Sequence, residues 1–345
     1  MQNAMIAMSG GVDSSVAAYL MLEQGYHCLG GTMLLWDTQP ASVNDAKSVC
    51  NNLGIPFHIF DASGEFRRDV VEPFIRAYED GLTPNPCYLC NQRLKFDWFL
   101  ERALELDCQY VVTGHYARLV RDNGRTLMYA APDKAKDQSY FLAGLTQHQL
   151  SHAIFPLGDM TKEQARAVAE AQGFINARKK DSQDICFIPD GDYKAFMERY
   201  TGKTYPCGNF LDCNGKIVGC HNGAVGYTLG QRKGLGLAMG APVYVCGKDM
   251  AANTVTVGPE SHLFASTVLA ENRNFIPFDE LTAPMQVTAK ARSRHLPQPA
   301  TVYPEEGGKI RVEFQEPQRA VTPGQAIVLY DGDLVIGSAT ITSAK

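Results

Sequence analysis

The chain has 345 residues, of which 45% are hydrophobic and 20% charged, and its formal net charge at pH 7 is −5. These values exclude an intrinsically disordered or strongly basic protein, and the length predicts two or three domains. No apolar run is long enough to span a bilayer and no basic signal-peptide region opens the chain, so we expect a cytoplasmic protein. Its ten cysteines are then expected to be buried thiols, metal ligands or catalytic groups.

The first third of the chain alternates apolar, strand-like runs with helix-like stretches. The predicted strands cover residues 4–8, 27–33, 57–61 and 110–114. The predicted helices cover residues 12–23, 44–53, 70–79 and 91–105. This alternation predicts an α/β domain with a doubly wound, mainly parallel sheet, in which the loops after the strands gather at one edge.

The first strand and helix are joined by residues 9–15, Ser-Gly-Gly-Val-Asp-Ser-Ser. The two glycines let backbone amides converge on an anion, and the following helix N-terminus attracts a phosphate. The segment lacks the lysine of a Walker A motif and resembles the SGGxDS signature of the PP-loop ATP pyrophosphatases. We call residues 9–15 the PP-loop, and we predict that it binds ATP and that Asp13 orients a metal ion or a reacting group.

A second motif places two cysteines, Cys87 and Cys90, after a stiff segment that contains two prolines. Cys90 stands at the start of the predicted helix 91–105, where a helix N-terminus lowers the pKa of a thiol. The cationic side chains of Arg93 and Lys95 are expected to lower this pKa further. On spacing alone, two buried structural cysteines remain an alternative to a reactive thiol.

The second half of the chain begins with a predicted helical stretch over residues 136–173, in which Thr161 is a plausible helix start. A third candidate thiol, Cys186, follows in a short apolar run, where a buried core cysteine is the alternative. Beyond about residue 205, short runs punctuated by Gly and Pro predict small β domains, the last a barrel, with a possible linker at residues 275–278. The predicted strands cover residues 243–245, 254–257, 286–290, 310–314 and 326–330.

These motifs occur in a specific order, together with the segments 113–118, 136–142, 184–188 and 226–236. The set resembles the bacterial tRNA-specific 2-thiouridylases, sulfurtransferases that thiolate the wobble uridine of certain tRNAs. The resemblance runs from about residue 4 to residue 330. It implies a PP-loop, adenine nucleotide alpha hydrolase-like catalytic domain at residues 1–200, a small central domain at residues 201–262 and a tRNA-contacting β-barrel at residues 263–345.

The resemblance also implies roles for individual residues. Cys90 matches the family's nucleophile and Cys186 its persulfide carrier, so a Cys90–Cys186 redox disulfide is implied. Catalytic or ATP-binding positions are matched by Ser9, Gly10, Gly11, Val12, Asp13, Ser14, Ser15, Val16, Met33 and Gly114. Positions that touch the target base or the tRNA are matched by Asn85, Pro86, Cys87, His115, Lys136, Asp137, Gln138, Arg292, Ser293 and Gln325.

The implied reaction uses ATP with Mg²⁺ to adenylate the C2 oxygen of uracil, and AMP then leaves as sulfur arrives from the cysteine persulfide. The implied partners are tRNA and a sulfur donor, either a cysteine desulfurase or a sulfur-relay protein. No membrane partner and no tightly bound cofactor are expected.

One residue departs from the family pattern, because Cys87 stands where the family commonly has Asp. An alternative is therefore an Fe–S cluster held by Cys87, Cys90 and Cys186, or more weakly a zinc site. A different alternative is another PP-loop ligase or amidotransferase, although such an enzyme has no use for the Cys90 and Cys186 motifs. The remaining cysteines of the central region, Cys207, Cys213 and Cys220, fit no common zinc spacing and are interpreted as structural.

Overall fold

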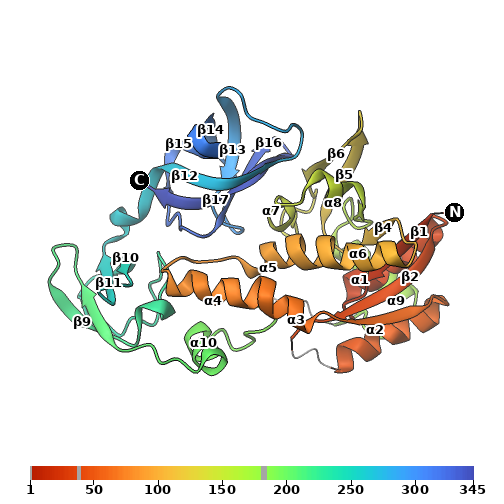
Figure 1. The fold of residues 1–345 in the computed structure, drawn as a ribbon, viewed down its shortest axis with the longest axis horizontal. Helices are drawn as coiled ribbons and strands as arrows, with labels where there is room; N and C mark the ends of the chain where they lie inside the picture. Colours follow the sequence, from red (N-terminus) through yellow and green to blue (C-terminus); the bar gives the residue numbers. More distant parts are fainter. Residues whose placement is uncertain (1, 37–39, 180–184) are drawn as a thin grey trace.

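The computed structural model describes residues 2–36, 40–179 and 185–345. The chain first forms a five-stranded, all-parallel sheet with the order β3-β2-β1-β4-β7 (Figure 1). Its strands are β1 (Asn3–Ala7), β2 (His27–Leu34), β3 (Phe57–Asp61), β4 (Tyr110–Val112) and β7 (Ala153–Ile154). The four strands predicted for this region are confirmed to within two residues.

Helices cover both faces of this sheet because the side chains of β1 alternate between two buried cores. Ile6 packs with residues of α1 (Val12–Glu23), α2 (Pro40–Leu53) and α9 (Lys162–Ala171). Met5 faces the other way and packs with the phenylalanine and leucine at the start of α6 (Phe99–Glu105). The doubly wound sheet is therefore confirmed.

Two long helices contain π-helical segments, and both begin earlier than predicted. The first joins α3 (Ser63–Phe66), η1 (Arg67–Val71) and α4 (Glu72–Glu79). The second joins α5 (Pro86–Leu89), η2 (Cys90–Trp98) and α6. The Asn85 side chain caps this second helix by accepting from the Tyr88 amide at 3.2 Å, and Pro86 suits the first helical position. Cys90 therefore lies one turn inside a helix, and its predicted position at an N-terminus is wrong.

The segment between β4 and α9 is not the continuous helical stretch that was predicted. A hairpin of β5 (Ala117–Asp122) and β6 (Arg125–Ala130) precedes the short helices α7 (Ser139–Leu142) and α8 (Gln147–Ser151). Residues 153–154 then pair with β4 as an edge strand, and this pairing breaks the helical pattern. The predicted start of α9 is correct, since Thr161 and Gln164 form a capping box.

The central part consists of α10 (Tyr193–Thr201), η3 (Ala224–Gly226) and a four-stranded sheet with the order β10-β11-β8-β9. The strands are β8 (Gly208–Leu211), β9 (Ile217–His221), β10 (Tyr244–Asp249) and β11 (Thr254–Gly258). Phe210, Val245 and Val255 are fully buried and form its core. A short η4 (Glu260–Leu263) leads on to the last part of the chain.

The last part is a closed six-stranded barrel, as predicted, because β12 pairs with both β15 and β17. The strands are β12 (Phe264–Phe275), β13 (Met285–Lys290), β14 (Gln298–Pro304), β15 (Ile310–Arg319), β16 (Ala326–Asp331) and β17 (Leu334–Ala344), with η5 (Glu306–Gly308) before β15. Residues 275–278 are not a domain linker, since Phe275 ends β12 and Ile276 is fully buried. The β5–β6 hairpin extends the barrel sheet through the Tyr129–Leu334 pair.

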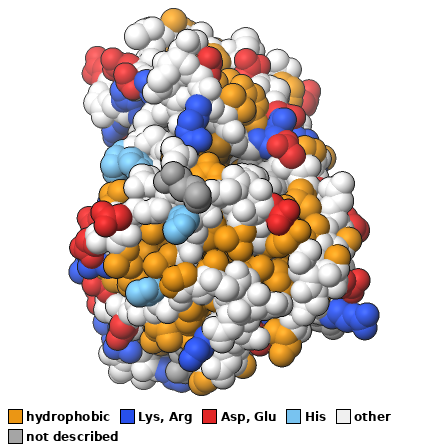
Figure 2. Space-filling view, turned by 90° about the vertical axis from the view of Figure 1, so that its right-hand side faces the viewer, with side chains coloured by type: hydrophobic (Ala, Val, Ile, Leu, Met, Phe, Trp, Pro, Cys, Tyr) orange, Lys and Arg blue, Asp and Glu red, His pale blue; other side chains and the backbone are white. Residues whose placement is uncertain are grey.

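Figure 2 shows the end of the molecule that carries the N-terminal sheet. Hydrophobic side chains occupy much of its middle and lower part, and basic side chains are scattered among acidic ones. This face therefore offers no continuous basic surface to a nucleic acid. Within the described ranges, no helix is both long enough and apolar enough to cross a membrane.

Candidate active site

The PP-loop turns sharply between β1 and α1 because Gly10 adopts a left-handed conformation with φ of 72°. A Cβ on Gly10 would lie 2.2 Å from the carbonyl oxygen of Ser42 in α2, so only glycine fits. Gly11 is the N-cap of α1 and has no side chain to occupy the helix N-terminus. The first-turn amides of α1 are therefore presented to an anion, as the sequence predicted.

Serine hydroxyls fix the shape of the PP-loop. The hydroxyls of Ser14 and Ser15 each donate to the Gly11 carbonyl at 3.0 Å, and the hydroxyls of Ser9 and Ser14 lie 3.2 Å apart. Gly114, which follows β4, packs so closely that a Cβ there would lie 2.6 Å from the carbonyl carbon of Asp13. Met33 lies near the end of β2, the strand beside β1. The structure thus brings the predicted ATP-binding residues together at one edge of the sheet.

Asp13 lies in the first turn of α1, and its carboxylate is held by two partners from distant segments. Lys162, the first residue of α9, places its Nζ 2.8 Å from both carboxylate oxygens, and the Tyr116 hydroxyl donates to Oδ1 at 2.8 Å. Lys162 is only 5% exposed. The Asp13 carboxylate therefore accepts two hydrogen bonds at Oδ1 and one at Oδ2 from these partners.

A second group from the segment after α9 holds the outer side of the PP-loop. The Asn176 amide donates to the Gly10 carbonyl at 3.2 Å and to the Ser15 hydroxyl at 2.9 Å. Lys179 donates to the Gly10 carbonyl at 3.2 Å and to Asp45 of α2 at 2.8 Å.

Sequence reasoning assigned no site role to Lys162, Tyr116 or Asn176. For Lys162 a signal was present, because a lysine in the first turn of a helix opposes the helix dipole and needs a nearby anion.

The three candidate thiols lie on two segments of the chain and act on one another electrostatically. Cys90 is buried in η2, whereas Cys87 and Cys186 are exposed, and all three are free. Burial raises the pKa of all three thiols, Cys186 and Cys87 raise that of Cys90 further, and the Lys95 ammonium offsets part of each rise. The backbone amides of Cys186 and Phe187 donate hydrogen bonds to the Cys186 sulfur and stabilise its thiolate. The structure therefore places the predicted nucleophile and the predicted persulfide carrier together.

The predicted lowering of the Cys90 pKa is wrong. Burial raises the pKa of this thiol to about 12, and the nearby Lys95 ammonium offsets only part of that effect. The physical reason is desolvation: the side chain lies inside a helix and inside a core that contains Phe66, Val70 and Leu94. Cys90 is consequently a protonated thiol at neutral pH until a base, a bound substrate or a movement changes its surroundings.

This raised pKa gives a testable prediction for thiol alkylation. Because only the thiolate reacts, the rate at which iodoacetamide modifies Cys90 should rise about tenfold per pH unit from pH 7 to 10, with no plateau. Mass spectrometry of the Cys90 peptide measures this rate, and Cys90→Ser identifies the peptide by its loss. A plateau near pH 8 would show that Cys90 has an activated thiol in the free protein.

The predicted base-binding segment before Cys87 is held by the barrel. The Gln325 side chain donates to the carbonyls of Thr83 at 2.8 Å and Pro84 at 3.3 Å, and the Thr83 amide donates to Pro323 at 2.9 Å. The same side of the helix that follows is tied to the barrel by Tyr88, whose hydroxyl lies 2.8 Å from that of Ser338. Gln325, predicted to touch tRNA, thus also fixes the segment that leads to the thiols.

Several predicted tRNA contacts are engaged inside the protein. His115 is buried between Phe96 and Phe155, with its Nδ1 2.6 Å from the Thr113 hydroxyl. Burial and the Lys95 charge hold the pKa of His115 well below its usual value, so the imidazole is neutral at pH 7. A neutral, buried histidine offers hydrogen bonding and stacking rather than charge to a nucleotide.

The predicted contacts at residues 136–138 form a turn that is tied to the end of β4. Asp137 accepts from the Ala131 amide at 3.0 Å and the Ser139 hydroxyl at 2.9 Å, and Gln138 accepts from the Tyr116 amide at 3.0 Å. Lys136 is half-buried. These bonds place the turn next to Tyr116, and hence next to Asp13.

Arg292 and Ser293 lie in the segment after β13, and both are half-buried. Arg292 donates to the Leu229 carbonyl at 2.9 Å and to the Thr322 hydroxyl, and Tyr140 partly offsets the lowering of its pKa by burial. This guanidinium thus joins the barrel to the central part. Asp184, the first residue of the motif segment 184–188, lies outside the described residues. Lys180 and residues 181–183 lie outside them as well.

The described residues show no arrangement of the three thiols that would hold a metal ion. Over residues 2–36, 40–179 and 185–345, no group of three or more His, Cys, Asp or Glu side chains is arranged to hold a metal ion. Cys87, Cys90 and Cys186 are all described, so this arrangement gives the Fe–S and zinc alternatives no support. We derive no step through such a cluster.

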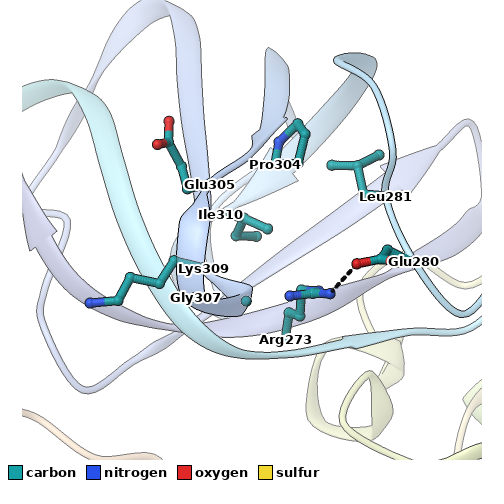
Figure 3. Close-up of a pocket in the computed structure, with 9 residues that line it drawn as sticks. Arg273, Glu280, Leu281, Pro304, Glu305, Gly307, Lys309 and Ile310 are labelled. Carbon is teal, nitrogen blue, oxygen red and sulfur yellow. Dashed lines mark hydrogen bonds and ion pairs between the residues drawn. The ribbon is translucent and has the colours of Figure 1, made fainter.

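A separate pocket lies on the barrel, between β12, β14 and the start of β15 (Figure 3). Arg273 and Glu280 form an ion pair of 3.2 Å across it, and Lys309 lies at its other side. None of the residues predicted from the sequence lines this pocket, so it is not the candidate active site.

Comparisons with known proteins match the whole chain. Residues 2–190 match the model of the tRNA methyl transferase HUP domain, residues 194–259 that of the tRNA methyl transferase PRC-barrel domain, and residues 265–341 that of the aminomethyltransferase beta-barrel domain. The tRNA-specific 2-thiouridylase MnmA of Clostridium acetobutylicum is 43% identical over 352 residues, which cover 99% of each chain. The protein of the same name from Acetivibrio thermocellus is 45% identical over 355 residues, again with 99% of each chain covered.

Solved structures that resemble part of the chain include a 4-thiouridine synthetase and an NMN synthetase. A 4-thiouridine synthetase in complex with RNA and bound ATP is 17% identical and has a TM-score of 0.37, over 55% of this chain and 45% of that chain. The NMN synthetase from Francisella tularensis is 15% identical and has a TM-score of 0.36, over 59% of this chain and 79% of that chain.

Proposed function

Since the chain belongs to the tRNA-specific 2-thiouridylase family, we propose that it is a tRNA sulfurtransferase that replaces the C2 oxygen of the wobble uridine with sulfur at the expense of ATP. The family assignment is preferred to the alternative of a PP-loop ligase or amidotransferase. That alternative would give Cys90 and Cys186 no role.

The observation that carries the mechanism is the continuity between the PP-loop and the thiols. Lys95 acts electrostatically on Cys90, on Cys186 and on His115. His115 follows Gly114, which packs on the backbone of Asp13. A nucleotide on the PP-loop and a base near the thiols would therefore share one site.

In the first step, the PP-loop amides and the N-terminus of α1 bind the triphosphate of ATP, and the uracil C2 oxygen attacks the α-phosphate. Pyrophosphate leaves, and the poor leaving oxygen becomes part of AMP, a good leaving group. Mg²⁺ supplies neutralisation of the triphosphate charge; we propose that it enters with the nucleotide, because Lys162 and Tyr116 engage the Asp13 carboxylate.

In the second step, sulfur comes from a persulfide on Cys186. The Cys90 sulfur, once deprotonated, attacks the Cys186 Sγ, releases the outer sulfur as hydrosulfide and forms a Cys90–Cys186 disulfide. Hydrosulfide adds to the activated C2 carbon, and AMP leaves. A cellular dithiol must then reduce the disulfide by two electrons before the next turnover.

Exposure assigns the two cysteines to different tasks. Cys186 is exposed and so is accessible to a donor protein, which we propose is a cysteine desulfurase or a sulfur-relay protein of the cytoplasm. Cys90 is buried and is thereby kept from reaction with external disulfides. The tRNA is proposed to contact the barrel at 263–345 and the catalytic domain at 1–200, on either side of the central domain at 201–262.

Mass spectrometry of tRNA nucleosides tests this function. Purified protein is incubated with unmodified tRNA, ATP, Mg²⁺ and sulfide, with and without anaerobic Fe–S reconstitution. A gain of 2-thiouridine at the wobble position in both arms supports the proposed reaction. A gain only after reconstitution would contradict the metal-free route, and no gain in either arm, with a desulfurase and cysteine also supplied, would contradict the proposed substrate.

The unusual Cys87 provides a further prediction. Cys87→Asp restores the residue that the family commonly has, so on a metal-free route the variant should retain thiolation within about threefold of the wild-type rate. The conservative Cys87→Ser separates the effect of losing the thiol from that of gaining a carboxylate. An inactive, colourless Cys87→Asp variant beside a brown, active wild type would instead identify Cys87 as a cluster ligand.

A further inference from the structure

Lys162 occupies a place that is unfavourable for a cation unless an anion compensates it. It is the first residue of α9, where the helix dipole repels positive charge, and only 5% of its surface is exposed. Both oxygens of Asp13 lie 2.8 Å from its Nζ. The buried ammonium and the half-buried Asp13 carboxylate, whose side chain is 32% exposed, therefore form an ion pair that joins α9 to the PP-loop.

Asp13 is favoured by the dipole of α1, but its charge conflicts with a phosphate bound at the same helix N-terminus. It lies in the first turn of α1, beside the glycines whose amides are presented to the triphosphate. A carboxylate without its counter-ion there would repel the phosphates that the helix N-terminus attracts. The Lys162 charge removes this conflict.

A neighbouring side chain indicates that the PP-loop is incomplete without a ligand. Asn176 is 3% exposed and donates through Nδ2 to Gly10 and Ser15. Its Oδ1 is buried and has no hydrogen-bond partner among the described residues. A buried acceptor of this kind calls for a donor from a bound molecule or its water.

On these observations, and resting on the ATP site proposed above, we propose that Lys162 is a positioning residue that cancels the charge of Asp13 and so makes the PP-loop electrostatically competent for the triphosphate. This role differs from that of a simple structural ion pair. If the pair only held α9 in place, losing either partner would have the same consequence. If Lys162 acts by charge, losing the lysine and losing the carboxylate have opposite consequences for ATP binding.

The test is a double-mutant cycle on ATP affinity, measured by titration calorimetry without tRNA, once with Mg²⁺ and once with EDTA. Lys162→Met should weaken ATP binding about tenfold or more, because it leaves Asp13 uncompensated. Asp13→Asn should bind ATP at least as tightly as the wild type, because it removes the repulsion. The double variant should recover to within about threefold of the wild type. Lys194→Met, which breaks the ion pair with Glu198 in α10 at 2.6 Å, is the matched control.

The outcomes separate the possibilities. Equal losses in Lys162→Met and Asp13→Asn, or a double variant as weak as Lys162→Met, would overturn the proposal in favour of a structural pair. A loss in Asp13→Asn with Mg²⁺ but not with EDTA would overturn it in favour of a metal-ligating Asp13. Thermal melts of each variant show whether it is folded at the titration temperature. A wild type that does not bind ATP would contradict the proposed function itself, which distinguishes that failure from the others.

Discussion

Cys90→Ser and Cys186→Ser should each abolish tRNA thiolation, with a fall in rate of about three orders of magnitude or more. A serine hydroxyl neither carries a persulfide nor attacks one at neutral pH, and oxygen for sulfur is nearly isosteric. Because tRNA affinity comes mainly from phosphate contacts, binding should remain within about twofold of the wild type. Nucleoside mass spectrometry, with a desulfurase and cysteine in place of sulfide as the sulfur source, measures thiolation, and a filter-binding assay measures tRNA affinity.

The two variants should also differ from each other. Cys186→Ser removes the exposed carrier, so protein mass spectrometry should find no added sulfur after treatment with a desulfurase and cysteine. Cys90→Ser should accumulate one sulfur on Cys186 and stop there. Cys207→Ser, another exposed cysteine, is the matched control and should keep full activity. Full activity in either of the first two variants would remove that residue from the mechanism.

Gly114→Ala should weaken ATP binding through a single methyl group. Its Cβ would lie 2.6 Å from the carbonyl carbon of Asp13 and 2.8 Å from the carbonyl oxygen, and backbone atoms at the start of a helix cannot move aside as a flexible side chain does. Such overpacking typically costs about 1–3 kcal/mol, so ATP affinity should fall by about 5- to 150-fold as the PP-loop is displaced. Titration calorimetry without tRNA measures the change.

The matched control is Gly64→Ala in α3, where a Cβ would meet no atom within 4 Å. Alanine has a higher helix propensity than glycine, so this variant should be neutral or slightly more stable, by up to about 1 kcal/mol. An ATP affinity for Gly114→Ala within twofold of the wild type would show that the contact between Gly114 and Asp13 does not shape the ATP site.

The parts of the fold that sequence predicted well are those that local rules determine. The PP-loop between β1 and α1 depends on glycines, a short apolar strand and a helix start, all within residues 3–23. The α9 start depends on a capping box of four residues. The closed barrel was predicted only as a class, since β12, β14 and β17 were not predicted and the pairing of β12 with β15 and β17 that closes the barrel joins residues far apart in the chain.

The candidate active site likewise combines features that local sequence predicts with features that depend on long-range packing. The cysteines were identifiable by motif, but the raised pKa of Cys90 depends on a core drawn from η1, η2 and residues 187–188, which no local pattern reveals. Asn85 followed by Pro86 is a typical N-cap residue followed by a typical first helical residue. This pair indicates a helix start ahead of Cys90. Lys162 has its partner 149 residues away, so only its unfavourable place in a first turn pointed to a function.

The joints between the catalytic domain and the barrel have a consequence for how such a chain evolves. Tyr140 of α7 donates to Ala326 in the barrel at 2.8 Å, the β5–β6 hairpin continues the barrel sheet, and Gln325 holds the segment before Cys87. Removing the barrel would therefore break these hydrogen bonds and expose apolar surface of the catalytic domain to water. The barrel is thus not an interchangeable module. Replacing it with an unrelated RNA-binding domain would require matching changes at all three contacts. The barrel and the thiol site are therefore expected to evolve together.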